Sequence, residues 1–206
     1  MQKIQFWYDL ASPYSYLTAM RIELLASPYA VEVEWKPFLL GPIFAAQGWN
    51  TSPFNLYPAK GRYLIRDMER ICADRDLPFK MPQPFPQNSL YAARLALIGE
   101  DEGWVAPFSR ALFTLQFGEG ASLTDKAVLA EALRKAGRAL EAIMPRIEQP
   151  EIKEGLKARV TKAQALGIFG APSFIIDTGD VFWGDDRLEQ ALLWKCRFSR
   201  PPGQFT

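Results

Sequence analysis

The sequence predicts an α/β protein in which a long helical segment interrupts a small mixed sheet. Two observations carry this prediction. Strand-like patterns occur only near the two ends of the chain, and every periodic segment between residues 59 and 166 repeats at helical spacing. An ordinary α+β domain is the alternative, because sequence patterns leave the topology open.

The N-terminal elements predict a β-α-β unit. Residues 4–9 are typical of a strand, residues 14–25 of the helix that follows, and residues 31–35 alternate apolar and charged side chains as a half-exposed strand does. Such a unit has parallel strands and a right-handed crossover. Residues 41–58 carry Gly, Pro, Asn and aromatic residues without a period, which predicts a long irregular loop.

The middle of the chain is predicted to be helical. Apolar side chains recur three or four positions apart along several stretches. They are Tyr63, Leu64, Met68, Ile71 and Cys72; Leu90, Ala93 and Leu97; Phe108, Leu112 and Leu115; and Val128, Leu129, Ala132, Leu133 and Ala136. Thr124 is expected to cap the last of these stretches, and Gly167 to end the helical segment.

The C-terminal elements predict a β-hairpin and a closing helix. Strands at residues 173–177 and 180–183 are separated by a Thr-Gly step, which is a short hairpin signal. Asp185 or Asp186 can cap the helix that follows.

The complete order of elements is that of the thioredoxin fold with a helical insertion after the second strand. We therefore assign residues 1–57 and 167–206 to a thioredoxin-like domain, and residues 58–166 to an all-helical insertion domain. A chain of 206 residues is long enough for one domain with an insertion of this size.

The composition argues against several classes of function. Lys and Arg number 24 and Asp and Glu 23, so no excess charge favours nucleic acid or an anionic membrane. No apolar run is long enough to span a bilayer, and no signal-peptide pattern is present, which predicts a cytoplasmic protein. The absence of His removes Ser-His-Asp and Cys-His catalysis and most zinc sites, so we expect no metal.

The two cysteines do not form a redox motif. Cys72 and Cys196 are far apart in sequence, and each lies on an apolar helical face, where a buried structural role is expected. If the protein is an enzyme, a cofactor or cosubstrate therefore brings the reactive group.

Residues 6–17, Phe-Trp-Tyr-Asp-Leu-Ala-Ser-Pro-Tyr-Ser-Tyr-Leu, are the most informative part of the chain. They predict a strand that leads into a helix N-terminus, where unpaired N–H groups favour an anion. The spacing Ser12-x-x-Ser15 has the form of a Cys-x-x-Cys motif with both sulfurs replaced by oxygen. A cap without function is the alternative, because Ser followed by Pro is an ordinary helix start.

A second motif, Gly-Ala-Pro-Ser-Phe at residues 170–174, predicts an edge that binds through its backbone. Pro172 lacks an N–H and fits only the start of a strand, a sheet edge or a bulge. A cis bond between Ala171 and Pro172 would turn the Ala171 N–H and C=O outward, where they could pair with an extended peptide. A trans bond at a plain strand start is the alternative.

Taken together, these motifs resemble the kappa-class glutathione transferase and 2-hydroxychromene-2-carboxylate isomerase family, a DsbA-like branch of the thioredoxin fold. The resemblance lies in residues 9–17, residues 168–174, the Phe-Trp-Gly-Asp-Asp-Arg-Leu run at 182–188 and the Pro-rich segment 52–61. It extends over essentially the whole chain. It implies glutathione as the cosubstrate, and family members are usually homodimers.

The resemblance also implies where glutathione binds. Ser12 corresponds to the catalytic serine, whose hydroxyl faces the glutathione sulfur. Ala171, before a cis Pro172, corresponds to the residue whose backbone pairs with the cysteinyl part. The segment that holds the γ-glutamyl end falls on Trp183, Gly184, Asp185 and Asp186. Either aspartate could pair with the ammonium group, and N–H groups of the last helix could accept the neighbouring carboxylate.

The remaining contacts follow from the same resemblance. Asn55 corresponds to an asparagine near glutathione and substrate, Lys60 to a lysine that would meet the glycyl carboxylate, and Asn88 to the substrate-binding turn. An aromatic acceptor pocket is predicted from a group of rings, although core packing explains such rings equally well. The rings are Phe38, Phe44, Trp49, Phe54 and Phe85.

The implied chemistry is that of a thiolate without a redox step. A Cys in place of Ser12 could form a mixed disulfide with glutathione, whereas a hydroxyl cannot. We expect a glutathione-dependent cis–trans isomerase, similar to 2-hydroxychromene-2-carboxylate isomerase, that adds the thiolate reversibly to a small aromatic carboxylate or another electrophile. The alternatives are a kappa-like transferase, whose adduct leaves intact, and a redox-inactive thioredoxin-like module that binds peptides.

Overall fold

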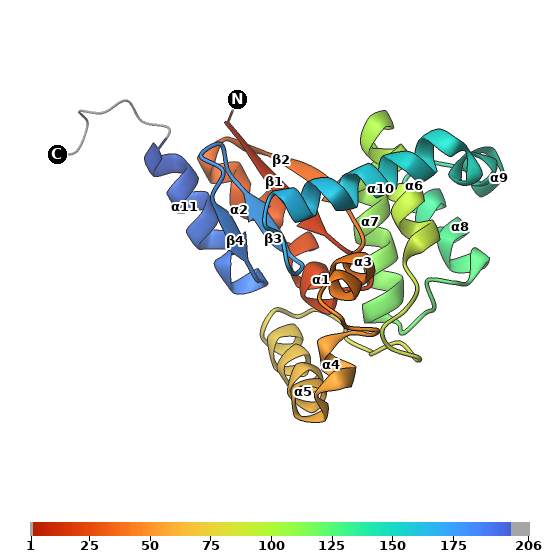
Figure 1. Ribbon diagram of the computed structural model, residues 1–206, viewed down its shortest axis with the longest axis horizontal. Coiled ribbons are helices and arrows are strands. Elements are labelled where there is room, and N and C mark those ends of the chain that lie inside the picture. Colours follow the sequence, from red (N-terminus) through yellow and green to blue (C-terminus); the bar gives the residue numbers. More distant parts are fainter. Residues whose placement is uncertain (1, 199–206) are drawn as a thin grey trace.

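A mixed four-stranded sheet with the order β2-β1-β3-β4 forms the centre of the protein (Figure 1). The computed structural model describes residues 2–198. β1 (Gln2–Tyr8) pairs in parallel with β2 (Val31–Pro37), whereas β3 (Ser173–Ile175) is antiparallel to both β1 and β4 (Val181–Trp183). The predicted fold class, β-α-β unit and C-terminal hairpin are therefore confirmed.

The pairing of β1 with β3 brings the two sequence motifs together. Trp7, near the end of β1, lies opposite Ser173, the first residue of β3. Because the strands are antiparallel, the chain that leaves β1 and the chain that enters β3 lie at the same end of the sheet.

The helix predicted at residues 14–25 is divided in two. α1 spans Pro13–Ala19, α2 spans Ile22–Ala26, and a 3₁₀ turn, η1 (Ser27–Tyr29), follows. The backbone leaves helical geometry at Arg21, where φ is −132°, and the Arg21 side chain reaches the C-terminal part of the fold. A tertiary contact therefore accompanies this break, and the local pattern does not reveal it.

Part of the segment predicted as an irregular loop is helical. α3 (Leu40–Ala46) and α4 (Pro53–Leu56) occupy much of residues 41–58. Each has Pro in its first turn, where the helix does not use the backbone N–H, and Ser52 caps α4 by accepting from the Phe54 N–H. Helices this short contain too few residues to show a period.

The middle of the chain is helical, as predicted. Its elements are α5 (Pro58–Asp74), α6 (Leu90–Glu102), α7 (Val105–Phe113), the π-helical turn η2 (Thr114–Gly118), α8 (Lys126–Lys135), α9 (Leu140–Ile143), the 3₁₀ turn η3 (Met144–Glu148) and α10 (Pro150–Ala165). The cap of α8 is Asp125 and not Thr124, because the Asp125 carboxylate accepts from the Ala127 N–H. Gly167, with φ of +76°, ends α10 as expected.

Helices cover both faces of the sheet. Phe6 and Tyr8 of β1 face α1 and the last helix, α11 (Leu188–Phe198), whereas Trp7 faces α3 and α10. α10, inside the predicted insertion, thus packs on the sheet, and Figure 1 shows it crossing there. A single core extends from the sheet into α6, α7 and α8. The division into two domains stays a prediction.

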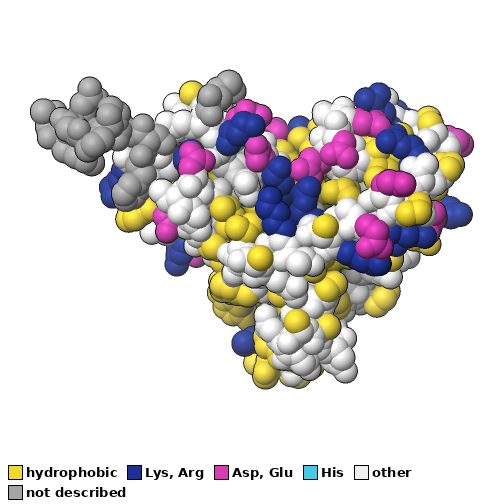
Figure 2. All heavy atoms as spheres, turned by 45° about the horizontal axis from the view of Figure 1, so that its top comes forward, with side chains coloured by type: hydrophobic (Ala, Val, Ile, Leu, Met, Phe, Trp, Pro, Cys, Tyr) yellow, Lys and Arg dark blue, Asp and Glu magenta, His cyan; other side chains and the backbone are white. Residues whose placement is uncertain are grey.

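The surface carries both signs of charge. Figure 2 shows acidic and basic side chains close to one another over the visible face, in keeping with the near balance of charges in the sequence. In the part of the chain that the structure describes, no helix has the length and apolar character needed to cross a membrane.

Candidate active site

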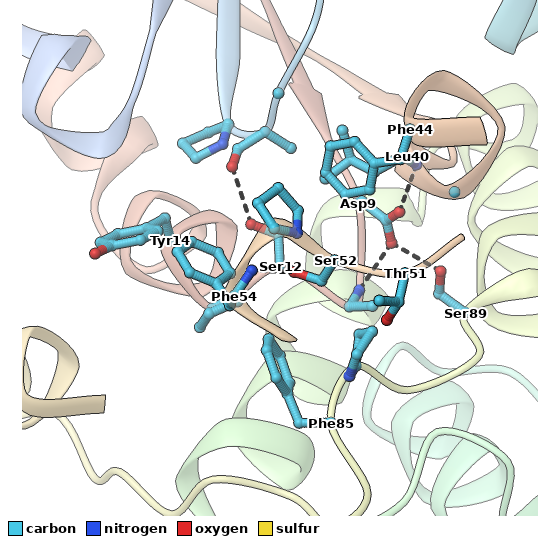
Figure 3. A pocket seen from close by; sticks show the side chains of 18 of the residues that line it. Asp9, Ser12, Tyr14, Leu40, Phe44, Thr51, Ser52, Phe54, Phe85 and Ser89 are labelled. Atoms are coloured by element: carbon cyan, nitrogen blue, oxygen red, sulfur yellow. Dashed lines mark hydrogen bonds between the residues drawn. The ribbon is translucent and has the colours of Figure 1, made fainter. Parts of the chain in front are cut away.

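A cavity of about 1420 Å³ opens at the end of the sheet where the two motifs meet (Figure 3). It is lined by the turn after β1, by α3 and α4, by one side of α5, and by the segment before α6. The loop before β3 and the turn after β4 complete the wall. Pockets for a single small ligand are usually about 300–1,000 Å³ in volume, so this cavity is large enough for more than one small molecule.

Outside the predicted group of aromatic rings, all but one of the predicted glutathione-binding and substrate-binding residues line this cavity, as does Phe44 from that group. They are Ser12, Phe44, Lys60, Asn88, Ala171, Pro172, Trp183, Gly184, Asp185 and Asp186. Asn55 is not among the lining residues. Its side-chain nitrogen donates to the Thr51 hydroxyl and to the Phe85 carbonyl, at 3.2 and 3.1 Å, and so ties α4 to the segment before α6.

Ser12 joins the two motifs directly. Its Oγ donates to the Ala171 carbonyl at 3.0 Å and accepts from the Ser15 N–H at 3.3 Å, and its side chain is almost buried. The bond between Ala171 and Pro172 is cis, as one of the two alternatives predicted. Ser12 is therefore a helix cap and a cavity residue at once.

Ser15, the second serine of the motif, lies outside the cavity. It is fully buried, and its Oγ has no hydrogen-bond partner among residues 2–198. Only the first of the two motif positions therefore faces the cavity.

Asp9 organises the floor of the cavity and was not predicted from the sequence. Its carboxylate accepts from the Ala11 N–H at 2.8 Å, from the Leu40 N–H at 2.7 Å and from the Ser89 hydroxyl at 2.7 Å (Figure 3). These donors belong to the turn before α1, to α3 and to the start of α6. Burial raises the pKa of Asp9, and the three hydrogen bonds oppose this effect.

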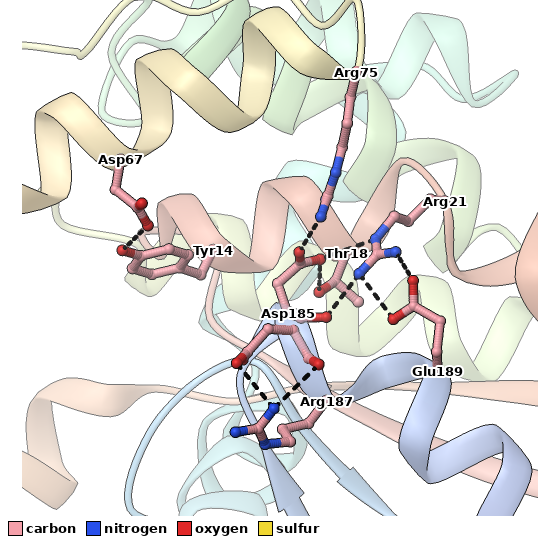
Figure 4. A network of polar contacts seen from close by, with 9 residues as sticks. Tyr14, Thr18, Arg21, Asp67, Arg75, Asp185, Arg187 and Glu189 are labelled. Atoms are coloured by element: carbon pink, nitrogen blue, oxygen red, sulfur yellow. Dashed lines mark hydrogen bonds and ion pairs between the residues drawn. The ribbon is translucent and has the colours of Figure 1, made fainter.

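Of the two aspartates predicted to cap the last helix, Asp185 does not do so. Gly184 occupies the cap position before the 3₁₀ turn η4 (Asp185–Arg187), and no side chain caps it. The Asp185 carboxylate instead accepts from the Thr18 hydroxyl at 3.0 Å, from Arg21 Nε at 3.1 Å and from Arg75 Nη2 at 2.7 Å (Figure 4). Asp185 is 4% exposed, and this network joins α1, α5 and the turn after β4.

Asp186 differs from its neighbour. Its side chain is 74% exposed and pairs with Arg187 at 3.1 Å. Of the two aspartates, only Asp186 is open to a ligand cation.

A second contact fastens α5 to α1. The Tyr14 hydroxyl donates to the Asp67 carboxylate at 2.9 Å (Figure 4), and the Tyr63 hydroxyl donates to the same carboxylate at 3.3 Å. Burial and the neighbouring Asp67 both raise the pKa of Tyr14. Tyr14 therefore remains a neutral hydrogen-bond donor on the cavity wall.

Aromatic rings line the cavity at several positions. Phe44 and Trp49 have ring centroids 5.7 Å apart, and Phe54 and Phe85 also line the space. Phe38, which was predicted with them, is fully buried and packs against Trp7 in the core beneath the sheet. For Phe38 the core-packing alternative is therefore correct.

Neither cysteine takes part in this site. Cys72 is buried, and burial raises its pKa to about 11, whereas Cys196 is half-buried. Neither residue lines the cavity. The predicted structural role is confirmed for Cys72.

A family model described as the DSBA-like thioredoxin domain matches residues 3–192. The chain belongs to this DsbA-like thioredoxin family. Within it, the chain is 28% identical to 2-hydroxychromene-2-carboxylate isomerase of Sphingobium xenophagum over 188 residues, which are 90% of this chain and 94% of the relative. It is 25% identical to glutathione S-transferase kappa 1 of Homo sapiens over 199 residues, which are 90% and 87% of the two chains.

A solved structure of 2-hydroxychromene-2-carboxylate isomerase superimposes on this DsbA-like chain with a TM-score of 0.83 at 24% identity, covering 95% of this chain and 97% of the other. A probable DsbA oxidoreductase of Streptomyces coelicolor gives a TM-score of 0.75 at 20% identity, covering 100% and 94%. The predicted resemblance to the isomerase and kappa-class family is therefore confirmed, and these neighbours confirm the DsbA-like fold.

Proposed function

We propose that this DsbA-like protein binds reduced glutathione and uses its thiolate in a redox-neutral isomerisation. The observation that carries the proposal is the contact between Ser12 Oγ and the Ala171 carbonyl, 3.0 Å apart on the cavity wall. It places a hydroxyl donor beside a backbone edge, which is what recognition of a cysteinyl residue requires.

Glutathione would enter by an exchange of hydrogen bonds. The cysteinyl N–H donates to the Ala171 carbonyl, and the Ser12 hydroxyl, released from that carbonyl, donates to the sulfur. A hydroxyl that donates to the sulfur favours thiolate over thiol. α1 is only 7 residues long, so we assign the stabilisation of the thiolate to the hydroxyl more than to the helix dipole.

The two ends of glutathione would meet different charges. Asp186 is the aspartate open to the γ-glutamyl ammonium, because the Asp185 carboxylate already accepts hydrogen bonds from Thr18, Arg21 and Arg75. Lys60 would meet the glycyl carboxylate from the first turn of α5, where its Nζ lies 4.8 Å from the centre of the Tyr57 ring. Asn55 contributes indirectly, since it holds the Phe85 segment in place.

The chemistry needs no change of oxidation state. The thiolate adds to a conjugated carbon–carbon double bond, one C–S bond forms, and the electron pair moves onto the conjugated acceptor group. The former double bond can then rotate. Reversal of the addition breaks the C–S bond and returns the thiolate and the isomerised product.

The second substrate we propose is a small aromatic carboxylate of the 2-hydroxychromene-2-carboxylate type. Phe44, Trp49, Phe54 and Phe85 line the cavity and offer rings for stacking against it, and Asn88 lines the cavity as well. Relatives named as 2-hydroxychromene-2-carboxylate isomerases support this choice. We propose in addition that the protein is a homodimer and acts in the reducing cytoplasm, where glutathione stays a thiol.

A kappa-like glutathione transferase is the second candidate, favoured by the relatives of that name. It would use the same thiolate but release the adduct. The two are separated by incubating the protein with glutathione and a panel of conjugated aromatic acids and electrophiles, followed by analysis of products and free thiol. An isomerised product with full recovery of glutathione supports the isomerase, a stable conjugate supports the transferase, and no turnover of any compound contradicts both.

A further inference from the structure

The two cations that line the cavity, within the described part of the chain, lie at opposite ends of α5. Lys60 is in its first turn, and Arg75 follows its last residue. The other charged residues of the wall are carboxylates, namely Asp9, Asp67, Asp185 and Asp186. Glutathione also carries two carboxylates, one at each end, so each of the two cations could pair with one of them.

The spacing of the two cations suits the length of glutathione. The rise of a helix puts Cα atoms at positions 60 and 75 about 22 Å apart. An extended tripeptide spans about 10 Å, and the two long side chains can cover the remaining distance. Lys60 Nζ lies 4.8 Å from the centre of the Tyr57 ring and Arg75 Nη2 donates to Asp185 at 2.7 Å, so both side chains must turn toward a ligand between them to reach its ends.

The guanidinium group of Arg75 uses only some of its hydrogen-bond donors within the protein. Its Nη2 donates to Asp185, whereas Nη1 is buried and has no hydrogen-bond partner among residues 2–198. The whole side chain is 27% exposed. A guanidinium group has a planar fork of donors suited to a carboxylate, and a buried donor without an acceptor is costly.

Arg21, the other arginine on Asp185, is placed differently. It spreads its nitrogens over the Asp185 carboxylate, the Asp185 carbonyl and Glu189, and it does not line the cavity. Asp185 therefore keeps a charged partner when Arg75 engages a ligand (Figure 4).

We propose that Arg75 adds a charged donor to the N–H groups of the last helix that are expected to bind the α-carboxylate of the γ-glutamyl residue, so that α5 selects thiols with a carboxylate at each end. The inference rests on the proposed glutathione function and extends it. The direction in which glutathione lies along α5 follows from the contacts of Arg75. Arg75 reaches the turn after β4, beside Asp186, to which we assign the γ-glutamyl ammonium. The glycyl end then lies toward Lys60.

The test compares three thiols on the wild-type protein and on Arg75→Gln. Dissociation constants are measured for reduced glutathione, for 4-aminobutyryl-Cys-Gly, which lacks only the α-carboxylate, and for γ-Glu-Cys, which lacks only the glycine. Wild type is expected to prefer glutathione to 4-aminobutyryl-Cys-Gly by about tenfold, the effect of one charge-assisted hydrogen bond. Arg75→Gln is expected to reduce this preference to within about twofold and to keep the preference for glutathione over γ-Glu-Cys.

Arg66→Gln is the matched control, since Arg66 lies on α5, pairs with Glu69 and does not line the cavity. It should bind all three thiols as wild type does. Each preference is a ratio within one variant, so a loss of stability cancels from it. An equal weakening of glutathione and 4-aminobutyryl-Cys-Gly in Arg75→Gln would show that Arg75 only braces Asp185, and it would overturn the inference.

An unchanged preference in Arg75→Gln, or a wild-type protein that binds both thiols equally, would also overturn the inference while the glutathione function stands. A wild-type protein that binds none of the three thiols would overturn both.

Discussion

Replacing Asp9 by Ala tests whether one buried carboxylate holds the cavity floor together. The substitution removes the acceptor of two backbone N–H groups, those of Ala11 and Leu40, and of the Ser89 hydroxyl. A buried donor left without an acceptor costs about 1–3 kcal/mol, and the hydroxyl can rotate away, so the two N–H groups together predict a loss of roughly 2–6 kcal/mol. This is a large share of the 5–15 kcal/mol, roughly, that stabilises a typical domain.

The assay is urea unfolding followed by tryptophan fluorescence, with Asp125→Ala as the matched control. Asp125 also accepts from a backbone N–H, but it is an exposed helix cap, for which a loss of about 1 kcal/mol is expected. Asp9→Asn keeps one acceptor oxygen and should fall between the two. A loss for Asp9→Ala no greater than that for Asp125→Ala would refute the assignment of Asp9 as the organising residue.

The direction in which pH changes the free energy of unfolding also follows from the environment of Asp9. Burial raises the pKa of Asp9 above its ordinary value of 3.8, so the folded protein binds this proton more tightly than the unfolded chain does. The part of the stability that comes from binding this proton is therefore fully present below 3.8 and is lost as the pH rises through the folded-state pKa, whereas the acceptor contacts of the carboxyl group remain. The free energy of unfolding of wild type, relative to Asp9→Asn, should fall with rising pH across that window. A rise would contradict the raised pKa.

Two further predictions concern other residues of the site and core. The Cys72 thiol, buried and with its pKa raised to about 11, should resist alkylation in the folded protein at mildly alkaline pH; rapid labelling detected by mass spectrometry would contradict this. In Gly170→Ala the new Cβ would overlap with Trp183 Nε1, so the indole must move. Because Trp183 is 52% exposed, we expect weaker glutathione binding, by several-fold, with little change in the urea midpoint. Unchanged affinity would show that Trp183 is not a ligand contact.

Local patterns were sufficient for most of the fold. Alternation in residues 31–35 predicted β2, and helical spacing predicted the long helices, because each pattern reports one buried face of one element. The same patterns missed α3 and α4, which are too short to show a period, and the break at Arg21, which accompanies a contact with Asp185 far along the chain.

For the candidate site too, local motifs could predict some residues, whereas others depend on contacts between distant parts of the chain. Ser12 and Pro172 could be predicted because each lies in a short motif that constrains the local backbone: Ser followed by Pro starts a helix, and Pro172 lacks the N–H that a strand interior needs. Asp9, Asp67 and Arg75 could not, since an aspartate after a strand or a charge on a helix is most often solvated. Their roles depend on partners brought together by the fold, such as Leu40 for Asp9.

The central claim is that Ser12 stabilises the thiolate of bound glutathione. A pH titration of the ultraviolet absorbance of that thiolate tests it most directly, with Ser12→Ala beside Ser15→Ala, a buried hydroxyl that makes no hydrogen bond among residues 2–198. In wild type and Ser15→Ala the thiol pKa should lie about one unit below its ordinary value of about 8.5, and in Ser12→Ala it should return toward that value. Titration curves for wild type and Ser12→Ala that coincide would contradict the account.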